Sequence, residues 1–445
     1  MGAAGAGERG HRRAGVRAVT AAVRNSQAGQ PVRANEPTRA TEPPPAAQPA
    51  PPAAATAVAA RLRAALAAAE DDRVIYDLPG IEERYDELRR LLPGVDVRFA
   101  MKACPVDDVL ARLAQKGAGF DAASPGEVDQ ALRAGAPATR IHYGNTVKSD
   151  RSILAAHRLG VRDFATDSPE DVAALAALAP GARVFCRLAT TGEGALWGLS
   201  RKFGCTPEEA VRVLAGARDA GLTPAGLSVH VGSQQMTAAA WRRAFDMFAD
   251  VLAALAADGI DLDHVNLGGG LPALGYRDLR GRPLVPDLDD TFATIRAGMA
   301  RLRAAVRGPL RFVVEPGRHL VADHGAIRAH VARLASRRRA DGGRGYWLFL
   351  SCGKFNGLYE VDQLQYPLVF PSHGAAAELV PAVVAGPTCD SDDVVAEGRV
   401  PVQVPRAAAS GDPVWILSSG AYAVSYMTRG FNGYGPLPHT CLRAG

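Results

Sequence analysis

The chain of 445 residues is long enough for two or three domains, and its 47% hydrophobic and 22% charged residues are ordinary for a globular protein. The net charge of +5 is small and much of the basic excess lies near the N-terminus, which argues against a nucleic-acid-binding surface. No apolar run approaches the roughly 20 residues that span a bilayer, and the six cysteines show neither CxxC pairs nor metal-ligand spacing, so we expect no membrane partner, no metal, and free thiols in a reducing cytoplasm.

Residues 1–56 consist largely of Ala, Pro, Arg and Gly and end in PPPAAQPAPPAAA. Such a segment cannot bury enough apolar surface to offset its ordering entropy, so we predict that it is disordered. Its excess of Arg over acidic residues resembles a transit peptide, although the apolar stretch of a secretory signal is missing. A solvated tail, or a start codon assigned too far upstream, is the simpler interpretation.

Residues 57–320 alternate short apolar runs with amphipathic stretches such as PVDDVLARLAQKG and SPEDVAALAALA. This alternation predicts strand–helix units, and eight units in succession predict a (β/α)8 barrel. An open doubly wound sheet is the alternative, which so many sequential strands disfavour. The predicted strands are 97–103, 119–124, 141–145, 163–167, 183–189, 226–232, 264–270 and 311–317.

Residues 321–445 have a different texture, with short β-rich runs separated by Pro and Gly, among them GYWLFLS, ELVPAVVAG, RVPVQVP and DPVWILSSGAY. They predict a C-terminal, mainly β domain. The first residues after the tail are also candidates to join this domain rather than the barrel.

Polar side chains and glycines stand where the predicted strands end, and in a barrel these carboxyl ends form the active-site face. Each has an ordinary explanation when taken alone: a surface lysine, a satisfied core histidine or a glycine-rich turn. The residues concerned are Lys102, Asp121, Asn145, Asp167, Arg187, His230, Gly268, Gly269, Gly270, Glu315 and Arg318.

Taken together, these residue types suit one cofactor. A lysine amine can form an imine, and the N–H groups of a glycine triplet, with a nearby guanidinium, can hold a phosphate. A carboxylate can keep a pyridine nitrogen protonated, and an imidazole can lie against the ring. These are the requirements of pyridoxal 5'-phosphate (PLP), which we therefore predict as the cofactor.

Blocks along residues 70–440 resemble the ornithine/lysine decarboxylases, which are PLP-dependent enzymes of the alanine-racemase-like group known as fold-type III. They occur in the order expected for that family, and nine of them over one chain are specific for the family but not for the substrate. The blocks are FAMKACPVDDVLARLAQKGAGFDAASPGEVDQAL, IHYGNTVKS, LSRKFGC, HVGSQ, VNLGGGLP, VEPGRHLV, GPTCDSDD, SSGAY and FNGYG.

The resemblance implies a role for each site residue. Lys102 would bind the cofactor covalently, Glu315 would hold the pyridine nitrogen protonated, and His230 would stack on the ring. Asp121 and Arg187 would line the lysine side of the pocket. The phosphate would be bound by Ser233, Gly268, Gly269, Gly270, Arg318 and Tyr422.

The motif CDSDD resembles the family's loop that enters the active site of the partner subunit. Cys389 would ensure that the proton is delivered to Cα of the substrate rather than to the cofactor, and Asp390 would contact the distal ammonium of a diamine-like substrate. Each active site would then be shared across a homodimer.

One segment of the β domain, WLFLSCGKFNGLYE, departs from the family pattern. Bacterial relatives that act on lysine or ornithine have an Asp two residues before the Gly, whereas this chain has Ser351 followed by Cys352. Leaving a buried ammonium short of a counter-charge costs several kcal/mol. Compensation by Asp390, Asp392, Asp393 or Glu360 is open, and Asp390 and Cys352 are the candidate substrate-binding residues.

Three functions stay open at this point. The first is decarboxylation of ornithine or lysine to putrescine or cadaverine, and the second is the same chemistry on a modified or carrier-linked amino acid of a specialised pathway. The third is an inactive regulatory homologue, which the presence of Lys102, Glu315 and Arg318 disfavours. A diaminopimelate decarboxylase would carry CES rather than CDS, and an alanine racemase a tyrosine base near position 389.

Overall fold

The computed structural model describes residues 60–198, 202–339 and 342–443, and the tail predicted to be disordered lies outside these ranges. Eight parallel strands close into a barrel, in which the last strand pairs with the first through Phe312 and Val95. All eight fall within or overlap the predicted runs: β2 (Val95–Ala100), β3 (Gly119–Ala122), β4 (Ile141–Tyr143), β5 (Asp163–Thr166), β6 (Arg183–Arg187), β8 (Thr223–Ser228), β10 (His264–Asn266) and β11 (Arg311–Val314).

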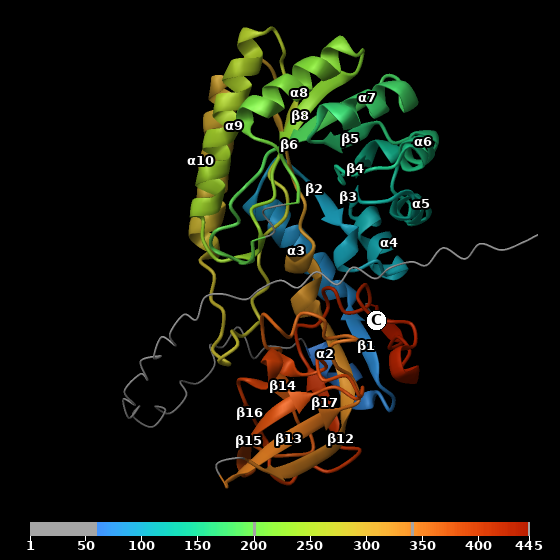
Figure 1. Cartoon of the computed structure of the whole chain (residues 1–445), viewed down its shortest axis with the longest axis vertical. Coiled ribbons are helices and arrows are strands. Elements are labelled where there is room, and N and C mark those ends of the chain that lie inside the picture. Colours follow the sequence, from blue (N-terminus) through green and yellow to red (C-terminus); the bar gives the residue numbers. More distant parts are fainter. Residues whose placement is uncertain (1–59, 199–201, 340–341, 444–445) are drawn as a thin grey trace, which may run out of the picture. The chain divides into compact units, whose positions relative to one another are not determined.

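Helices surround these strands (Figure 1). Several begin at a Ser or Thr whose hydroxyl accepts a hydrogen bond from the third helical residue; Thr206 and Glu209, for example, form a full capping box. The helices are α3 (Leu78–Leu91), α4 (Asp107–Gln115), α5 (Pro125–Arg133), α6 (Asp150–Arg158), α7 (Pro169–Leu178), α8 (Pro207–Asp219), α9 (Ala239–Ala257), α10 (Leu288–Ala305) and the short α11 (Arg318–Val321).

The second part of the molecule is an eight-stranded sheet that also includes β1 (Arg73–Asp77), a strand that precedes the barrel in the sequence. β1 pairs antiparallel with β12 and parallel with β18. Helix α2 (Ala60–Ala68) packs on the same sheet. The other strands are β12 (Gly325–Arg338), β13 (Arg344–Leu350), β14 (Leu368–Val369), β15 (Leu379–Ala385), β16 (Val402–Pro405), β17 (Pro413–Ile416) and β18 (His439–Leu442).

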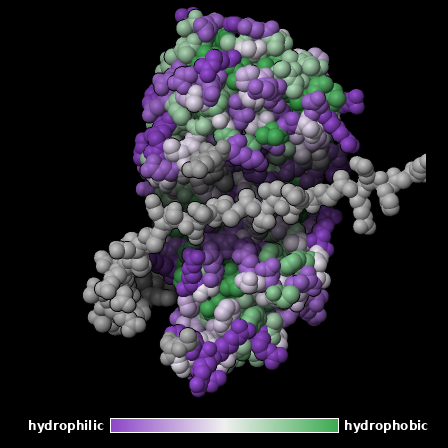
Figure 2. Space-filling model, viewed as in Figure 1, coloured by the Kyte–Doolittle hydropathy of each residue, from purple (hydrophilic) through white to green (hydrophobic). Residues whose placement is uncertain are grey.

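Barrel and sheet share one apolar core, because a single cluster of buried side chains includes Phe99 and Phe120 of the barrel and Ile327 and Val414 of the sheet. The face shown in Figure 2 is mostly hydrophilic, with apolar side chains scattered over it. Within the described ranges, no helix is both long enough and apolar enough to cross a membrane.

Candidate active site

One pocket collects most of the residues that the sequence singled out, at the carboxyl ends of the barrel strands. Ala100, Leu271 and Gly317 complete its wall. The predicted residues that line it are Lys102, Asp121, His230, Ser233, Gly269, Gly270, Glu315, Arg318 and Tyr422.

Other predicted residues lie outside this lining. Arg187 ends β6, with its guanidinium 4.9 Å from the Phe203 ring. The Gly268 N–H donates a hydrogen bond to Asn266 Oδ1 at 2.9 Å, so Gly268 stabilises the glycine turn without lining the pocket. Cys352 is fully buried in the core of the β domain, where burial raises the pKa of its thiol. The structure therefore does not bring Cys352 to the pocket.

Lys102 lies in a turn of 3-10 helix, Met101–Ala103, directly after β2. Its side chain is exposed along the pocket. The protein surroundings disfavour the ammonium by desolvation, but Tyr422 and the carboxylates of Asp121 and Glu315 outweigh this and raise the pKa of Lys102. An amine that binds a cofactor covalently must reach into the pocket, and Lys102 lines it.

Glu315 follows β11, and one of its carboxylate oxygens is fully engaged. Oε1 accepts a hydrogen bond from Asn266 Nδ2 at 2.5 Å and lies 2.9 Å from His142 Nε2. Oε2 has no hydrogen-bond partner among the described residues, so it is free to accept a hydrogen bond from a protonated ring nitrogen in the pocket.

His142 and Asn266 were not among the predicted site residues, although both lie inside predicted strands. His142 Nε2 is also 3.2 Å from Asp121 Oδ1, so one imidazole joins the two carboxylates. The alternation of side chains along a strand places such residues inside the barrel, but it does not give their depth or their partners.

His230 is held in a defined orientation by the backbone, since the Gly232 N–H donates to its Nδ1 at 3.1 Å. Desolvation, together with Lys102 and Arg187, lowers the pKa of His230 to about 3. Its imidazole is therefore neutral at physiological pH, with the proton on Nε2, and can pack against an aromatic ring without adding charge.

The glycine triplet forms a cradle that has no room for side chains. A Cβ on Gly268 would overlap the Val229 carbonyl, and one on Gly270 would lie 2.6 Å from the Gly232 carbonyl oxygen; both glycines have positive φ, 66° and 114°. The N–H groups of Gly269 and Gly270 have no acceptor among the described residues. They are available to an anion.

Arg318 faces this cradle at the start of α11. It is 4% exposed, and its Nη2 donates to Ser233 Oγ at 3.2 Å, whereas its Nε is buried with no partner in the described part of the chain. Its guanidinium lies 4.8 Å from the Tyr422 ring and 4.6 Å from the Trp197 ring.

A buried carboxylate of the β domain also binds Arg318. Glu360 accepts hydrogen bonds from both terminal nitrogens at 2.5 and 2.6 Å, and the Tyr276 hydroxyl lies 2.9 Å from Nη1. Glu360 was a candidate to compensate for the acid that is missing near Ser351. Its pairing with Arg318 places it beside the guanidinium that lines the pocket instead.

The other acids that could replace the missing carboxylate are mostly occupied. Asp393 is buried and accepts from the Lys354 N–H at 2.7 Å and from the Thr388 hydroxyl at 2.7 Å, and Asp392 pairs with Lys354 Nζ at 2.7 Å. Asp390 has no cationic partner within the described ranges. Of the acids in the CDSDD loop, it is the one whose charge is left for a ligand.

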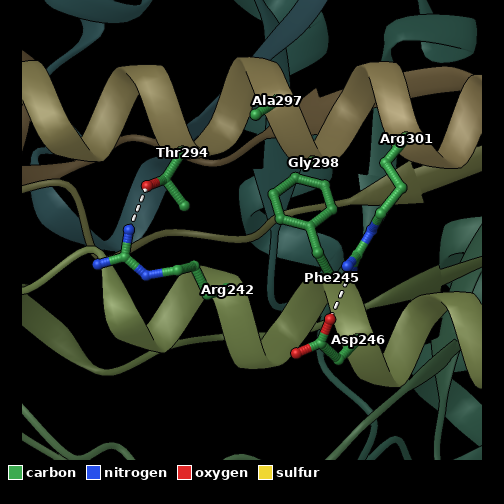
Figure 3. Close-up of a pocket in the computed structure, with 7 residues that line it drawn as sticks. All are labelled: Arg242, Phe245, Asp246, Thr294, Ala297, Gly298 and Arg301. Atoms are coloured by element: carbon green, nitrogen blue, oxygen red, sulfur yellow. Dashed lines mark hydrogen bonds and ion pairs between the residues drawn. The ribbon is translucent and has the colours of Figure 1, made fainter.

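The pocket fits PLP. It offers an amine, a carboxylate oxygen without a partner, a neutral imidazole, two free backbone N–H groups and a buried guanidinium with an unpaired Nε. When bound, PLP acts as an electron sink for the charge left at Cα when a carboxylate departs as CO2. A second cavity, between α9 and α10, is lined by Arg242, Asp246, Arg301 and their neighbours, which include none of the predicted site residues (Figure 3).

Comparison with known proteins agrees with this assignment. The family described as "Pyridoxal-dependent decarboxylase, pyridoxal binding domain" matches residues 78–322. The lysine/ornithine decarboxylase of Selenomonas ruminantium is 32% identical over 364 residues, which cover 81% of this chain and 87% of the relative. A diaminopimelate decarboxylase of Deinococcus radiodurans is also 32% identical, over 357 residues, with coverage of 79% and 85%.

Solved structures show the same similarity. SrLDC in complex with PLP and cadaverine has a TM-score of 0.74 and 30% identity, with 85% of this chain and 92% of that chain covered. The lysine/ornithine decarboxylase of Vibrio vulnificus complexed with cadaverine has a TM-score of 0.75 and 28% identity, with coverage of 86% and 97%. The fold, the pocket and these relatives together establish that the chain belongs to the pyridoxal-dependent decarboxylase family and is a PLP-dependent amino-acid decarboxylase.

Proposed function

We propose that the enzyme decarboxylates L-ornithine or L-lysine and releases putrescine or cadaverine with CO2. The observation that carries this proposal is Asp390, a carboxylate in the CDSDD loop without a cationic partner among the described residues. A primary ammonium at the end of a substrate side chain supplies the missing positive charge. A second carboxylate, as in diaminopimelate, would meet a like charge there.

In this proposal each residue has one task. Lys102 holds the cofactor, and Glu315 keeps the ring nitrogen protonated through Oε2. His230 packs against the ring as a neutral imidazole, with Asp121 and Arg187 beside it. The phosphate is bound by Ser233, Gly268, Gly269, Gly270, Arg318 and Tyr422.

The active site is further proposed to be shared between two copies of the chain. Cys389 is exposed and neither it nor Asp390 lines the pocket that contains Lys102. The Cys389 N–H and thiol both contact Asn432 Oδ1, at 3.0 and 3.3 Å, and Phe431 and Tyr434 beside Asn432 are exposed. This apolar edge around a functional loop suits a homodimer in which the loop enters the partner's pocket.

Mixing two inactive variants tests the shared site. Lys102→Ala loses the amine and Asp390→Ala loses the loop carboxylate, so each homodimer should be nearly inactive. Random exchange of subunits places half of the protein in mixed dimers, and each mixed dimer has one intact site. About a quarter of the wild-type activity should return. No recovery after proven subunit exchange would contradict a shared site.

The substrate is tested by CO2 release from purified protein with added PLP, across ornithine, lysine, arginine and diaminopimelate, with Lys102→Ala as the blank. Release from ornithine or lysine supports the proposal, and release only from diaminopimelate or arginine contradicts it.

Ser351 favours a second candidate substrate, a modified or carrier-linked amino acid. Ser351 stands where the family has an acid, and its hydroxyl accepts a hydrogen bond from the His330 N–H at 2.9 Å. Cofactor binding without release from any of the four amino acids would favour this candidate.

A further inference from the structure

A histidine within the barrel joins the two carboxylates of the active site. His142 is the middle residue of β4 and is 2% exposed. Its Nε2 lies 2.9 Å from Glu315 Oε1 and 3.2 Å from Asp121 Oδ1. We propose that His142 is a positioning residue that carries a positive charge between these carboxylates, keeps both ionised and holds Glu315 with Oε2 directed at the ring nitrogen of PLP.

Electrostatics explains why a cation belongs at this place. The ligand atoms of Asp121, His142 and Glu315 all lie within 4.8 Å of one another. Two carboxylates this close repel each other in a poorly hydrated site, and one would take up a proton unless a positive charge stood between them. A protonated Glu315 could not keep a pyridine nitrogen in its cationic form, so the charge at His142 bears directly on the electron sink.

The surroundings of His142 favour the cation. Burial and the nearby Arg98 of β2 oppose protonation, but the hydrogen bonds and charges of Asp121 and Glu315 outweigh them and raise the pKa of His142. Arg98 is itself 3.7 Å from Asp163 of β5. On the β6 side, the neighbour is the uncharged ring of Phe185, 5.2 Å away.

Asp121 shows the same coupling from the other side. Burial opposes its ionisation, but the hydrogen bond and charge of His142, followed by Lys102 and Arg187, lower the pKa of Asp121. Gly144 packs directly beneath this carboxylate, and a Cβ there would overlap Asp121 Oδ1. Asn266 fixes Glu315 in turn by its 2.5 Å hydrogen bond to Oε1. Each carboxylate is thus anchored on one oxygen.

The first test measures the charge of His142 directly in the wild-type protein. Histidine labelled with 15N distinguishes a cationic ring, in which both nitrogens carry a proton, from a neutral ring. Across pH 6 to 8, with and without PLP, the His142 signal should stay cationic, and it is assigned as the one absent from His142→Gln. A neutral ring at pH 7 in the PLP-bound enzyme overturns the proposal.

The second test uses cofactor binding. His142→Gln keeps a hydrogen-bond donor but removes the charge, so the Kd for PLP should rise about tenfold. The acid limb of PLP binding, followed by visible absorbance, should move to higher pH by about one unit, because the carboxylates lose their cation. His264→Gln is the control: His264 is also buried and bonded to a carboxylate, Asp263, at 2.8 Å, but Asp263, unlike Asp121 and Glu315, does not line the pocket.

This inference rests on the proposed role of Glu315, and the two can fail separately. If wild-type protein binds PLP but His142→Gln matches it in Kd and in pH profile, the role of His142 is refuted while that of the pocket stands. If Glu315→Gln binds PLP as tightly as wild type and keeps its turnover, the role of Glu315 fails. Should His142→Gln not fold, the 15N titration of the wild-type enzyme, assigned from the remaining histidines, still decides the question.

Discussion

Lys102 is presented to the pocket by the backbone on both sides of it. The turn that carries it follows β2, and the Ala103 carbonyl accepts the Tyr422 N–H at 2.7 Å. Tyr422 has a φ of 61°, a strained conformation for a residue with a side chain. Strain of this kind persists where surrounding contacts over-determine the backbone, as they do beside Lys102.

Replacing Lys102 by Ala should therefore abolish the visible absorbance of bound PLP and lower CO2 release by at least about a hundredfold, because the covalent link to the cofactor is lost. The measurements are an absorbance spectrum and a CO2 assay on the same sample. Lys116→Ala is the matched control, since Lys116 is a surface lysine paired with Asp86 at 2.5 Å. An unchanged spectrum in the Lys102 variant would refute its assignment.

Cys389 is predicted to control where the proton goes. In Cys389→Ala, PLP binding should persist, but the cofactor should convert slowly to pyridoxamine phosphate as protonation at the wrong carbon becomes more frequent. Chromatography of the cofactor after many turnovers measures this error. Cys441→Ala removes a thiol of β18, outside that loop, and should not raise the amount of pyridoxamine phosphate. Equal amounts of pyridoxamine phosphate in both variants would show that the loop is misplaced in our proposal.

At the scale of elements, the barrel could be predicted because its strands are buried on both faces and read as short apolar runs with helices between them. The long strand β12 was not predicted as such, although Ile327, Ala329 and Val331 alternate with polar residues. The pairing of β1 with β12 and β18 joins segments hundreds of residues apart. Such non-local pairing leaves no local pattern in a sequence.

In the candidate site too, contacts between residues far apart in the sequence could not be predicted from a local pattern. Lys102, Glu315 and the glycine triplet stand at strand ends, where position alone signals chemistry. His142 and Glu360 contact partners on β3, directly after β11 and on α11, and only the folded barrel brings those partners together. Residues that line the pocket could therefore be predicted from the sequence better than the residues that hold them in place.

Two glycines in helices differ in the space around them, and this difference predicts opposite effects on stability when each is replaced by alanine. In Figure 3, Gly298 of α10 faces the Phe245 ring of α9, and a Cβ there would overlap that ring. Gly298→Ala should therefore lower the free energy of unfolding by about 1–3 kcal/mol. Gly216 of α8 is exposed with open space around it, so Gly216→Ala should raise stability by up to about 1 kcal/mol. Urea unfolding measures both, and the same sign for both variants would contradict the packing argument.

The barrel and the β domain both contribute residues to one pocket. Arg318 starts α11 in the barrel, whereas Glu360 and Tyr422 come from the β domain. A buried ion pair broken on one side leaves an uncompensated charge, at a cost of about 3–5 kcal/mol. Because Glu360 belongs to the β domain, the position of the Arg318 guanidinium in the pocket depends on correct docking of that domain.

Acid sensitivity is expected to arise in the same region. His319, next to Arg318, is 2% exposed, and its Nδ1–H donates to the Pro272 carbonyl at 2.8 Å. Burial, with a smaller effect of Arg84, lowers the pKa of His319 to about 4. An unfolded histidine titrates near 6.5, so between about pH 6.5 and pH 4 the unfolded chain binds a proton that the folded chain does not. Stability should fall as the pH is lowered through this range.

For one such histidine the slope approaches 1.4 kcal/mol per pH unit below pH 6. His319→Gln keeps an amide donor for Pro272 but cannot take up this proton. Urea unfolding of both proteins at pH 7, 6 and 5, at one fixed concentration, should give a variant that is less stable at pH 7 yet loses less stability on acidification. His230, whose pKa is also lowered by burial, titrates in the same direction and accounts for part of the slope that remains. Parallel curves for variant and wild type would contradict the lowered pKa of His319, because they would mean that His319 takes up a proton equally in the folded and the unfolded chain.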